Sequence, residues 1–352
     1  MEEIKSQDKL LQPHEIKPAA DLAVRTLSEL DKILLGRSEL HRLVLVGILS
    51  RGHILLEGVP GVGKTALIKT LGLLLNLEFK RVQFTPDLMP GDILGAHILQ
   101  QTPEGKREMV FQEGPIFTNI LLADEINRAS PKTQSALLEA MQEHNVTLLG
   151  VTRPLPKPFF VLASQNPIEL EGTYPLPEAQ LDRFLFKLKV PNPDVRTIEE
   201  IISTRRHGEP PLPSIRLTAH ELQSIFTILD QIYLAKPVSR YISRLVAATH
   251  PDSPESTELV KRYVSFGASP RAAIAIAEAA RGMAFFAGRP TVGFEDVKAV
   301  AGPALNHRLI LTYQAKFDKV TTESVIAGII KAVDETGISV SNDIEIKDAE
   351  MS

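Results

Sequence analysis

The segment GVPGVGKT, residues 58–65, has the residue types and spacing of a phosphate-binding loop. Its glycines let backbone N–H groups turn inward on a chain of phosphates, and the helix predicted after it presents a positive N-terminal end to the same charge. We expect Lys64 to reach the β- and γ-phosphates and the Thr65 hydroxyl to hold Mg²⁺. The expected nucleotide contacts in this segment are Gly58, Pro60, Gly61, Val62, Gly63, Lys64, Thr65 and Ala66.

Two adjacent carboxylates could supply what hydrolysis needs beyond phosphate binding. Asp124 and Glu125 end NILLADE, an apolar run that is typical of a buried strand. Carboxylates have little reason to end such a strand unless they face a cation or a reacting group. We expect Asp124 to hold Mg²⁺ through its water shell and Glu125 to act as general base on the attacking water. A strand that ends at the surface in acidic turn residues is the alternative.

Three further polar residues could complete such a site. Asn166 follows the next predicted strand, and we expect it to orient the water, since ligands bind at the carboxyl ends of parallel strands. Arg183 immediately precedes the last predicted strand. Arg271 follows Ser269 and Pro270, which look like a helix N-cap and first helical residue, so a bound anion would compensate a cation placed against the helix dipole. A turn residue and two surface arginines are the alternative.

These residues need a parallel sheet whose strands end at one edge. Helices are predicted at 18–35, 38–50 and 66–76, and short apolar strands at 53–57, 79–84, 119–123, 159–164 and 184–190. Strands that alternate with helices over about 170 residues indicate an α/β fold, a parallel sheet with helices on both faces. Alternating apolar residues predict two inserted hairpins, at 95–111 and 145–154.

The chain is long enough for two domains, because 352 residues exceed the size at which one hydrophobic core stops growing. The Pro-rich passage VPNPD closes the first, and helical patterns follow it. The predicted parts are an N-terminal tail 1–19, an α/β domain 20–194, a smaller all-helical domain 195–335, and a disordered acidic tail 336–352.

Composition excludes several other classes of function. The chain has no cysteine, so disulfides, thiolate metal sites and cysteine nucleophiles are excluded, and its histidines lack the paired spacing of a metal site. A net charge of -4 argues against a broad nucleic-acid surface. No apolar run approaches the roughly 20 residues of a membrane span, and the N-terminus lacks a cleavable export signal, so we expect a cytoplasmic protein.

In order, GVPGVGKT, LLADEINRA, ASQNP, PEAQLDRF and GASPRA resemble the motifs of the MoxR family of AAA+ ATPases. The match runs from about Leu34 to Leu311. The resemblance implies a P-loop AAA+ domain followed by a helical lid, with ATP and Mg²⁺ as cofactors. It also implies that the hairpin at 95–111 is the insertion that marks this clade.

The resemblance implies a role for each candidate residue. Lys64 and Thr65 correspond to Walker A, and Asp124 and Glu125 correspond to Walker B. Asn166 corresponds to sensor 1, Arg183 to the arginine finger and Arg271 to sensor 2. Leu35 and Gly36, in ILLGR, are similar to the segment that cradles adenine. The lid would bring Arg271 to the same phosphate as Lys64, whereas Arg183 would reach into the neighbouring subunit.

An arginine finger of this kind implies a homo-oligomeric ring, which we expect to hold six copies. In the family, hydrolysis drives chaperone-like maturation, metal insertion or assembly of a protein partner, often with a von Willebrand factor A domain protein. A nucleic-acid motor of the same clade stays open as an alternative, although Lys106, Arg107 and Arg153 in the hairpins lack a basic strip interleaved with aromatics. A nucleotide-gated binding module without turnover also stays open, although intact Glu125 and Asn166 argue against it.

Overall fold

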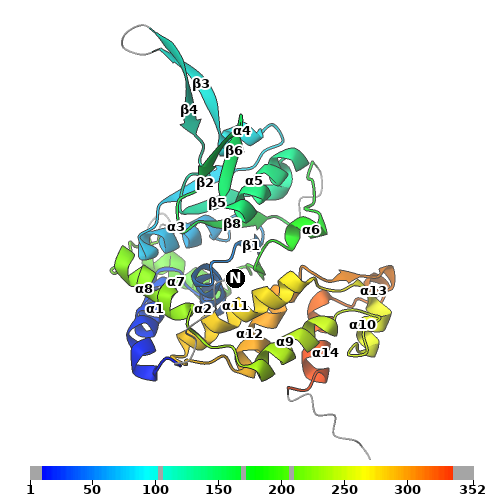
Figure 1. The fold of residues 1–352 in the computed structure, drawn as a ribbon. Coiled ribbons are helices and arrows are strands. Elements are labelled where there is room, and N and C mark those ends of the chain that lie inside the picture. Colours follow the sequence, from blue (N-terminus) through cyan, green and yellow to red (C-terminus); the bar gives the residue numbers. More distant parts are fainter. Residues whose placement is uncertain (1–9, 102–105, 168–171, 206–209, 336–352) are drawn as a thin grey trace, which may run out of the picture.

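The computed structural model describes residues 10–101, 106–167, 172–205 and 210–335. Its centre is a five-stranded parallel sheet, ordered β2-β5-β8-β1-β9 (Figure 1). The strands are β1 Ile54–Glu57, β2 Phe79–Gln83, β5 Ile120–Asp124, β8 Phe160–Gln165 and β9 Phe186–Lys189. Each was predicted from its apolar run to within two residues at either end, and the α/β fold class is confirmed.

The sheet has a hydrophobic core on each face. Successive side chains of a strand point to opposite faces, so along β5 Ile120 and Leu122 enter one core and Leu121 and Ala123 the other. Helices α1 Pro13–Ile33, α2 Ser38–Leu49 and α3 Lys64–Leu75 cover the first face. Helices α4 Pro90–Leu94, α5 Pro131–Glu143 and α6 Glu178–Leu181, with the short turn Ile126–Arg128, cover the second.

Helix α1 begins earlier than predicted. It starts at Pro13, so the expected N-terminal tail is wrong for residues 13–19. Pro18 lies inside the helix, where a proline costs about 3 kcal/mol. Ile16 and Ala19 are buried against the rest of the first core, and this apolar burial offsets that cost.

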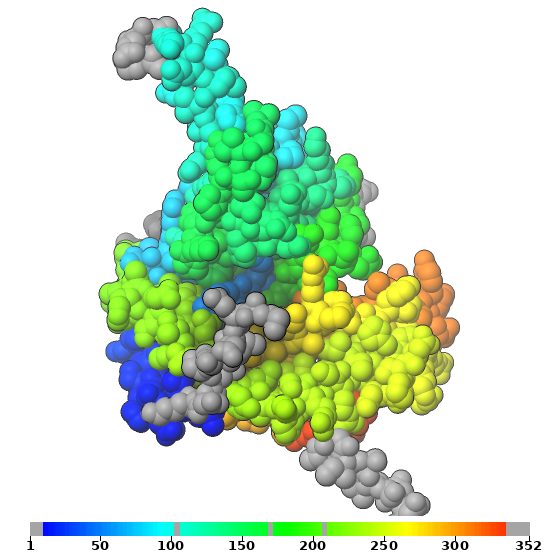
Figure 2. All heavy atoms as spheres, in the orientation of Figure 1, coloured from blue at the N-terminus to red at the C-terminus, as the bar shows by residue number. Residues whose placement is uncertain are grey.

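Both predicted hairpins are present. Strands β3 Gly95–Gln101 and β4 Arg107–Glu113 form a long antiparallel arm that projects from the molecule (Figures 1 and 2), and the expected turn at 102–105 lies outside the described residues. Strands β6 Asn145–Leu148 and β7 Val151–Pro154 form the second hairpin. Arg153 braces the base of the arm, because its guanidinium lies 3.8 Å from the centroid of the Phe111 ring.

The C-terminal part is mainly helical. Its helices are α7 Val195–Thr204, α8 Ala219–Leu229, α9 Lys236–Ala247, α10 Glu258–Tyr263, α11 Pro270–Phe286, α12 Phe294–Leu305, α13 Tyr313–Phe317 and α14 Thr322–Ala332. The expectation of an all-helical part is wrong in one place, where β10 Val264–Phe266 pairs antiparallel with β11 Ile310–Leu311. These strands are too short to give an alternating pattern. None of the helices described is long and apolar enough to cross a membrane. The predicted tail 336–352 lies outside the described residues.

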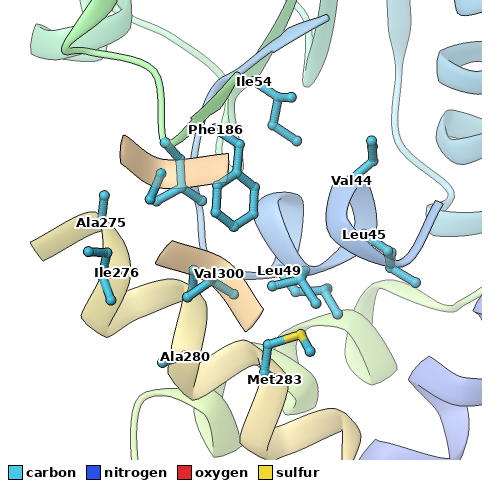
Figure 3. Close-up of a cluster of buried hydrophobic side chains, with 14 of the residues drawn as sticks. Val44, Leu45, Leu49, Ile54, Phe186, Ala275, Ile276, Ala280, Met283 and Val300 are labelled. Carbon is cyan, nitrogen blue, oxygen red and sulfur yellow. The ribbon is translucent and has the colours of Figure 1, made fainter. Parts of the chain in front are cut away.

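The helical part and the sheet share the first core. Figure 3 shows Met283 of α11 beside Leu49 of α2, with Ala280 of α11 and Phe186 of β9 in the same cluster. Helices α2 and α11 also approach closely, since a Cβ atom on Gly282 would lie 2.9 Å from the Ser50 hydroxyl oxygen. The division predicted near residue 194 therefore crosses a continuous hydrophobic core.

Candidate functional site

The phosphate loop connects β1 to α3 at the carboxyl edge of the sheet. Gly61 and Gly63 have φ angles of +81° and +89°, which other residues rarely adopt. At Gly58 a Cβ atom would lie 2.9 Å from the Val190 carbonyl oxygen, so a side chain is excluded by close contact. Helix α3 begins directly after the loop, at Lys64, and turns its N-terminal N–H groups toward it.

Lys64 lies across this loop. Its side chain is buried, with 7% of the residue exposed, and Nζ donates to the Gly58 carbonyl at 2.6 Å. Burial lowers the pKa of Lys64, and the negative charges of Asp124 and Glu125 oppose that shift. A phosphate at the loop would give this buried ammonium a direct charge partner.

A cavity of about 240 Å³ adjoins the loop. Its lining includes Leu35, Gly61, Val62, Gly63, Lys64 and Ala66 of the expected contacts, together with Arg37, Thr197 and Arg205. Gly36 lies behind it, with a φ of +82° and no room for a Cβ atom beside Thr197. Pro60 is exposed at the loop, and Thr65 is half-buried as the second residue of α3. The cavity suits an adenosine beside the phosphate loop.

The acid pair ends β5, beside the loop. Asp124 is its last residue, and Glu125 follows in the left-handed region with a φ of +57°. This conformation is uncommon for a residue with a side chain and is found at functional sites. Ser164 of β8 joins the two residues, because its hydroxyl donates to Asp124 Oδ1 and accepts from the Glu125 N–H at 2.9 Å.

Two residues of β2 and one after β5 contact the acid pair and escaped prediction. Arg81 Nε and Nη2 donate to Asp124 Oδ2 at 3.1 and 2.8 Å. Gln83 Nε2 and Arg128 Nη1 donate to Glu125 Oε2 at 2.8 and 2.9 Å. The segment FKRVQF does place Arg81 and Gln83 on one face of a strand, since residues two apart share a face. Predicting their contacts would also have required knowing which strand lies beside this one.

Asn166 follows β8 directly and is buried. Strand β8 lies between β5 and β1 in the sheet, so Asn166 is at the same carboxyl edge as Asp124 and the phosphate loop. The sequence interpretation anticipated this neighbourhood. The geometry allows the amide to face a nucleotide held by the loop.

The donors at this edge fit a metal that arrives with phosphates. The described residues contain no cluster of three or more histidines and carboxylates that could hold a metal. Thr65 and Asp124 offer a hydroxyl and one carboxylate. Mg²⁺ is usually held by one or two carboxylates together with substrate phosphates and water, so these residues suit a magnesium–nucleotide complex.

A second cavity, of about 300 Å³, lies at the opposite edge of the sheet. His53 and Leu185, which precede β1 and β9, line it, so it faces the amino ends of these strands. Arg183 and Arg271 line it too. A strand such as β1 spans roughly 10 Å, which separates both arginines from Lys64.

The position of Arg271 differs from the sequence expectation. It was expected beside the phosphate of its own chain, yet its Nη1 lies 3.8 Å from Asp182 Oδ2, and its side chain is 51% exposed. The predicted local structure is confirmed, because the Ser269 hydroxyl caps α11 and Pro270 is its first residue. Helix α11 starts as predicted, but the helical part packs on the sheet so that this helix start lies at the edge away from the phosphate loop.

Arg183 is fixed at this second edge by a backbone contact. Its Nη1 donates to the Leu138 carbonyl at 2.7 Å, and its buried Nε has no acceptor among the described residues. An unpaired buried donor costs free energy that a partner would recover. Arg183 and Arg271 together make this edge suited to an anion.

Comparisons with known proteins agree with the geometry. Residues 53–186 match the ATPase family associated with various cellular activities (AAA), and residues 256–329 match the AAA lid domain. Chaperone MoxR1 of Mycobacterium tuberculosis is 45% identical over 88% of this chain and 81% of its own. The uncharacterized protein YeaC of Bacillus subtilis is 40% identical, over 88% and 93%.

A solved structure extends the likeness to three dimensions. The crystal structure of a presumed ATPase from Cytophaga hutchinsonii superimposes with a TM-score of 0.82 at 39% identity, and the match covers 91% of this chain and 97% of that one. The overall fold therefore has an experimental counterpart.

Proposed function

The chain belongs to the MoxR family of AAA+ ATPases, and from that premise we propose that it hydrolyses Mg²⁺-ATP at a subunit interface to remodel, mature or assemble a protein partner. One observation supports a site shared between subunits: Arg183 and Arg271 lie at the opposite edge of the sheet from Lys64. A phosphate bound by one chain can meet these arginines only when they come from another chain.

ATP binds at the carboxyl edge of the sheet. The loop N–H groups and Lys64 hold the β- and γ-phosphates, and the adenosine occupies the cavity beside Leu35 and Ala66. Thr65 and Asp124 would hold Mg²⁺, which would neutralise phosphate charge there.

Hydrolysis follows from the groups around the γ-phosphate. Glu125 takes a proton from water as the water oxygen bonds to phosphorus and the bond to the ADP oxygen breaks. Asn166 orients that water. The contacts of Gln83 and Arg128 with Glu125 fix the carboxylate before the nucleotide arrives.

The second edge of a neighbouring copy completes the site. Arg183 and Arg271 approach the γ-phosphate held by the next chain and stabilise the charge that develops during transfer. Such an arginine typically contributes about 10³ to 10⁵ in rate. A head-to-tail contact of this kind closes into a ring, and we propose a ring of six.

The work done by hydrolysis is on protein. A relative named as a chaperone supports this assignment, and the net charge of -4 favours a protein client over nucleic acid. A von Willebrand factor A domain protein is the partner we propose, in keeping with the family.

Mixing two inactive variants tests the shared site. Lys64→Ala removes nucleotide binding but leaves the arginine edge, and Arg183→Ala does the reverse. In a random one-to-one mixture, roughly a quarter of the interfaces join an intact loop to an intact arginine edge. We therefore expect each variant alone to be inactive and the mixture to regain up to about a quarter of wild-type turnover.

The control is a one-to-one mixture of wild type with the double variant Lys64→Ala/Arg183→Ala. Shared rings keep about a quarter of the interfaces intact, whereas separate rings keep about half, so this mixture shows whether subunits share rings. Failure of the two-variant mixture to regain turnover, in rings shown to be mixed, contradicts the shared site.

A further inference from the structure

Arg308, which follows α12, holds the backbone that carries Arg183. All five N–H groups of its guanidinium donate to an acceptor: Asp182 Oδ1 at 2.7 Å, the carbonyls of Asp182 at 3.0 Å, Phe184 at 2.7 Å and Leu185 at 3.3 Å, and the carbonyl of Ala304. Four of these five acceptors belong to the segment on either side of Arg183. The guanidinium therefore fixes the course of that segment.

The two residues before Arg308 hold the same stretch of chain. His307 Nε2 donates to the Phe184 carbonyl at 3.1 Å, and Asn306 Nδ2 donates to the Lys187 carbonyl at 3.0 Å. The helical part is thus hydrogen-bonded to backbone carbonyls at the start of β9. These contacts do not depend on the identity of the side chains in that strand.

Arg308 is buried, with 8% of the residue exposed. Burial lowers the pKa of Arg308, and the carboxylate of Asp182 opposes the shift. A buried guanidinium is costly unless every donor is satisfied, so its place here depends on the complete set of acceptors. A leucine or methionine could fill the volume but could not set the direction of four backbone groups.

Asp182 connects this anchor to both arginines of the second edge. Its Oδ1 accepts from Arg308, and its Oδ2 accepts from the Ser269 hydroxyl at 2.7 Å. The same Oδ2 lies 3.8 Å from Arg271 Nη1, and Asp182 is the residue before Arg183. One carboxylate therefore relates the position of Arg183 to that of Arg271.

We propose that Arg308 is a positioning residue that, through Asp182, sets Arg183 and Arg271 side by side for the nucleotide of the neighbouring subunit. The proposal rests on the proposed function, in which both arginines act in that neighbour. Arg308 itself touches no nucleotide. Its loss would free the segment around Arg183, and a displacement of about 1 Å can lower a rate by about 10²-fold.

Arg308→Gln tests the proposal, with Asp182→Asn as a second variant that keeps the side-chain volume if the first destabilises the fold. We expect kcat to fall by about 10²-fold in both, with the KM for ATP changed by less than about twofold, because the phosphate loop lies at the other edge. Arg289→Gln is the matched control. It breaks a partly buried ion pair with Asp296 within the helical part, away from Asp182, and leaves kcat unchanged.

Mixed rings separate positioning from general damage. Rings of Arg308→Gln with Lys64→Ala should regain turnover to the level reached by Arg183→Ala with Lys64→Ala, because Arg308→Gln keeps an intact phosphate loop. If only the Arg183→Ala mixture regains turnover, Arg308 is not a positioning residue of this edge, while the proposed function stands. If neither mixture does, the proposed function itself is overturned. A wild-type kcat in both Arg308→Gln and Asp182→Asn also overturns the positioning role.

Discussion

At the scale of single residues, the carboxylate expected to hold the metal already has a cationic partner. Arg81 donates two hydrogen bonds to Asp124 Oδ2. A guanidinium and a magnesium ion both require the negative charge of this carboxylate. A metal bound near Asp124 would share this carboxylate with Arg81, whose positive charge weakens the apparent affinity for the metal.

Arg81→Ala should tighten the binding of a divalent metal with nucleotide. Because Arg81 is half exposed, we expect a modest change, about threefold to tenfold in the dissociation constant of Mn²⁺ measured by electron paramagnetic resonance with ADP present. Lys80→Ala is the control, since Lys80 carries the same charge on the other face of β2 and contacts Glu78 instead. Equal or weaker Mn²⁺ binding in Arg81→Ala would contradict the prediction.

The sequence predicted the residues of the carboxyl edge but not their partners. Lys64 begins the helix after β1, Asp124 ends β5 and Asn166 follows β8, so local patterns locate them. Arg81 contacts Asp124 only because β2 lies beside β5, and Arg308 contacts Asp182 across 126 residues of sequence. Contacts of this range depend on strand order and helix packing, which no local pattern encodes.

At the scale of elements, His53 joins α5 to the sheet. Its Nδ1 accepts from the Val161 N–H at 3.0 Å, and its Nε2 donates to the Met141 carbonyl at 3.1 Å. The bond accepted by Nδ1 requires the neutral ring, because a protonated Nδ1 cannot accept. Burial lowers the pKa of His53 to about 4.

The protein should lose stability in mild acid. The unfolded chain binds a proton at His53 near pH 6.5, whereas the folded chain does so only near pH 4, so the stabilisation is complete above about pH 6.5 and is lost as the pH falls between these values. Burial also lowers the pKa of His41 and His307, which add to the loss. His53 contributes about 1.4 kcal/mol per pH unit in that range.

Denaturant unfolding at several pH values between 7.5 and 5 measures this slope. His53→Gln should reduce it by the contribution of one proton, and His220→Gln, at an exposed histidine of α8, should keep the wild-type slope. An unchanged slope in a folded His53→Gln variant would rule out His53 as the cause.

The elements themselves were predictable where burial is regular. Strands β1, β5 and β8 are buried along continuous apolar runs, and their positions follow from those runs. The start of α1 was misplaced because Pro18 looked like a first helical residue, while the burial of Ile16 depends on packing with the helical part. Strands β10 and β11 were missed because their pairing is of long range.

At the scale of the whole molecule, the two edges of the sheet divide the work. The phosphate loop is at one edge and the two arginines are at the other, so under the proposed function a single chain holds two half-sites that cannot meet. Turnover should then depend on assembly.

Specific activity should rise with protein concentration and level off. On dilution into single subunits, turnover per chain should fall by about 10³-fold or more, the usual contribution of an arginine finger. Light scattering at the same concentrations reports the assembly state, and Arg183→Ala should show low activity throughout. A constant turnover per chain in solutions of single subunits would be incompatible with a shared site.

The close packing of α11 on α2 also limits how the chain can vary. Gly282 faces Ser50 and Val46 with no room for a side chain, and the core around it runs without a break from the sheet into the helical part. A lid grafted from a relative would bring its own surface to this contact and leave gaps or overlaps. A larger side chain on α2 at this contact should therefore require a compensating change on α11.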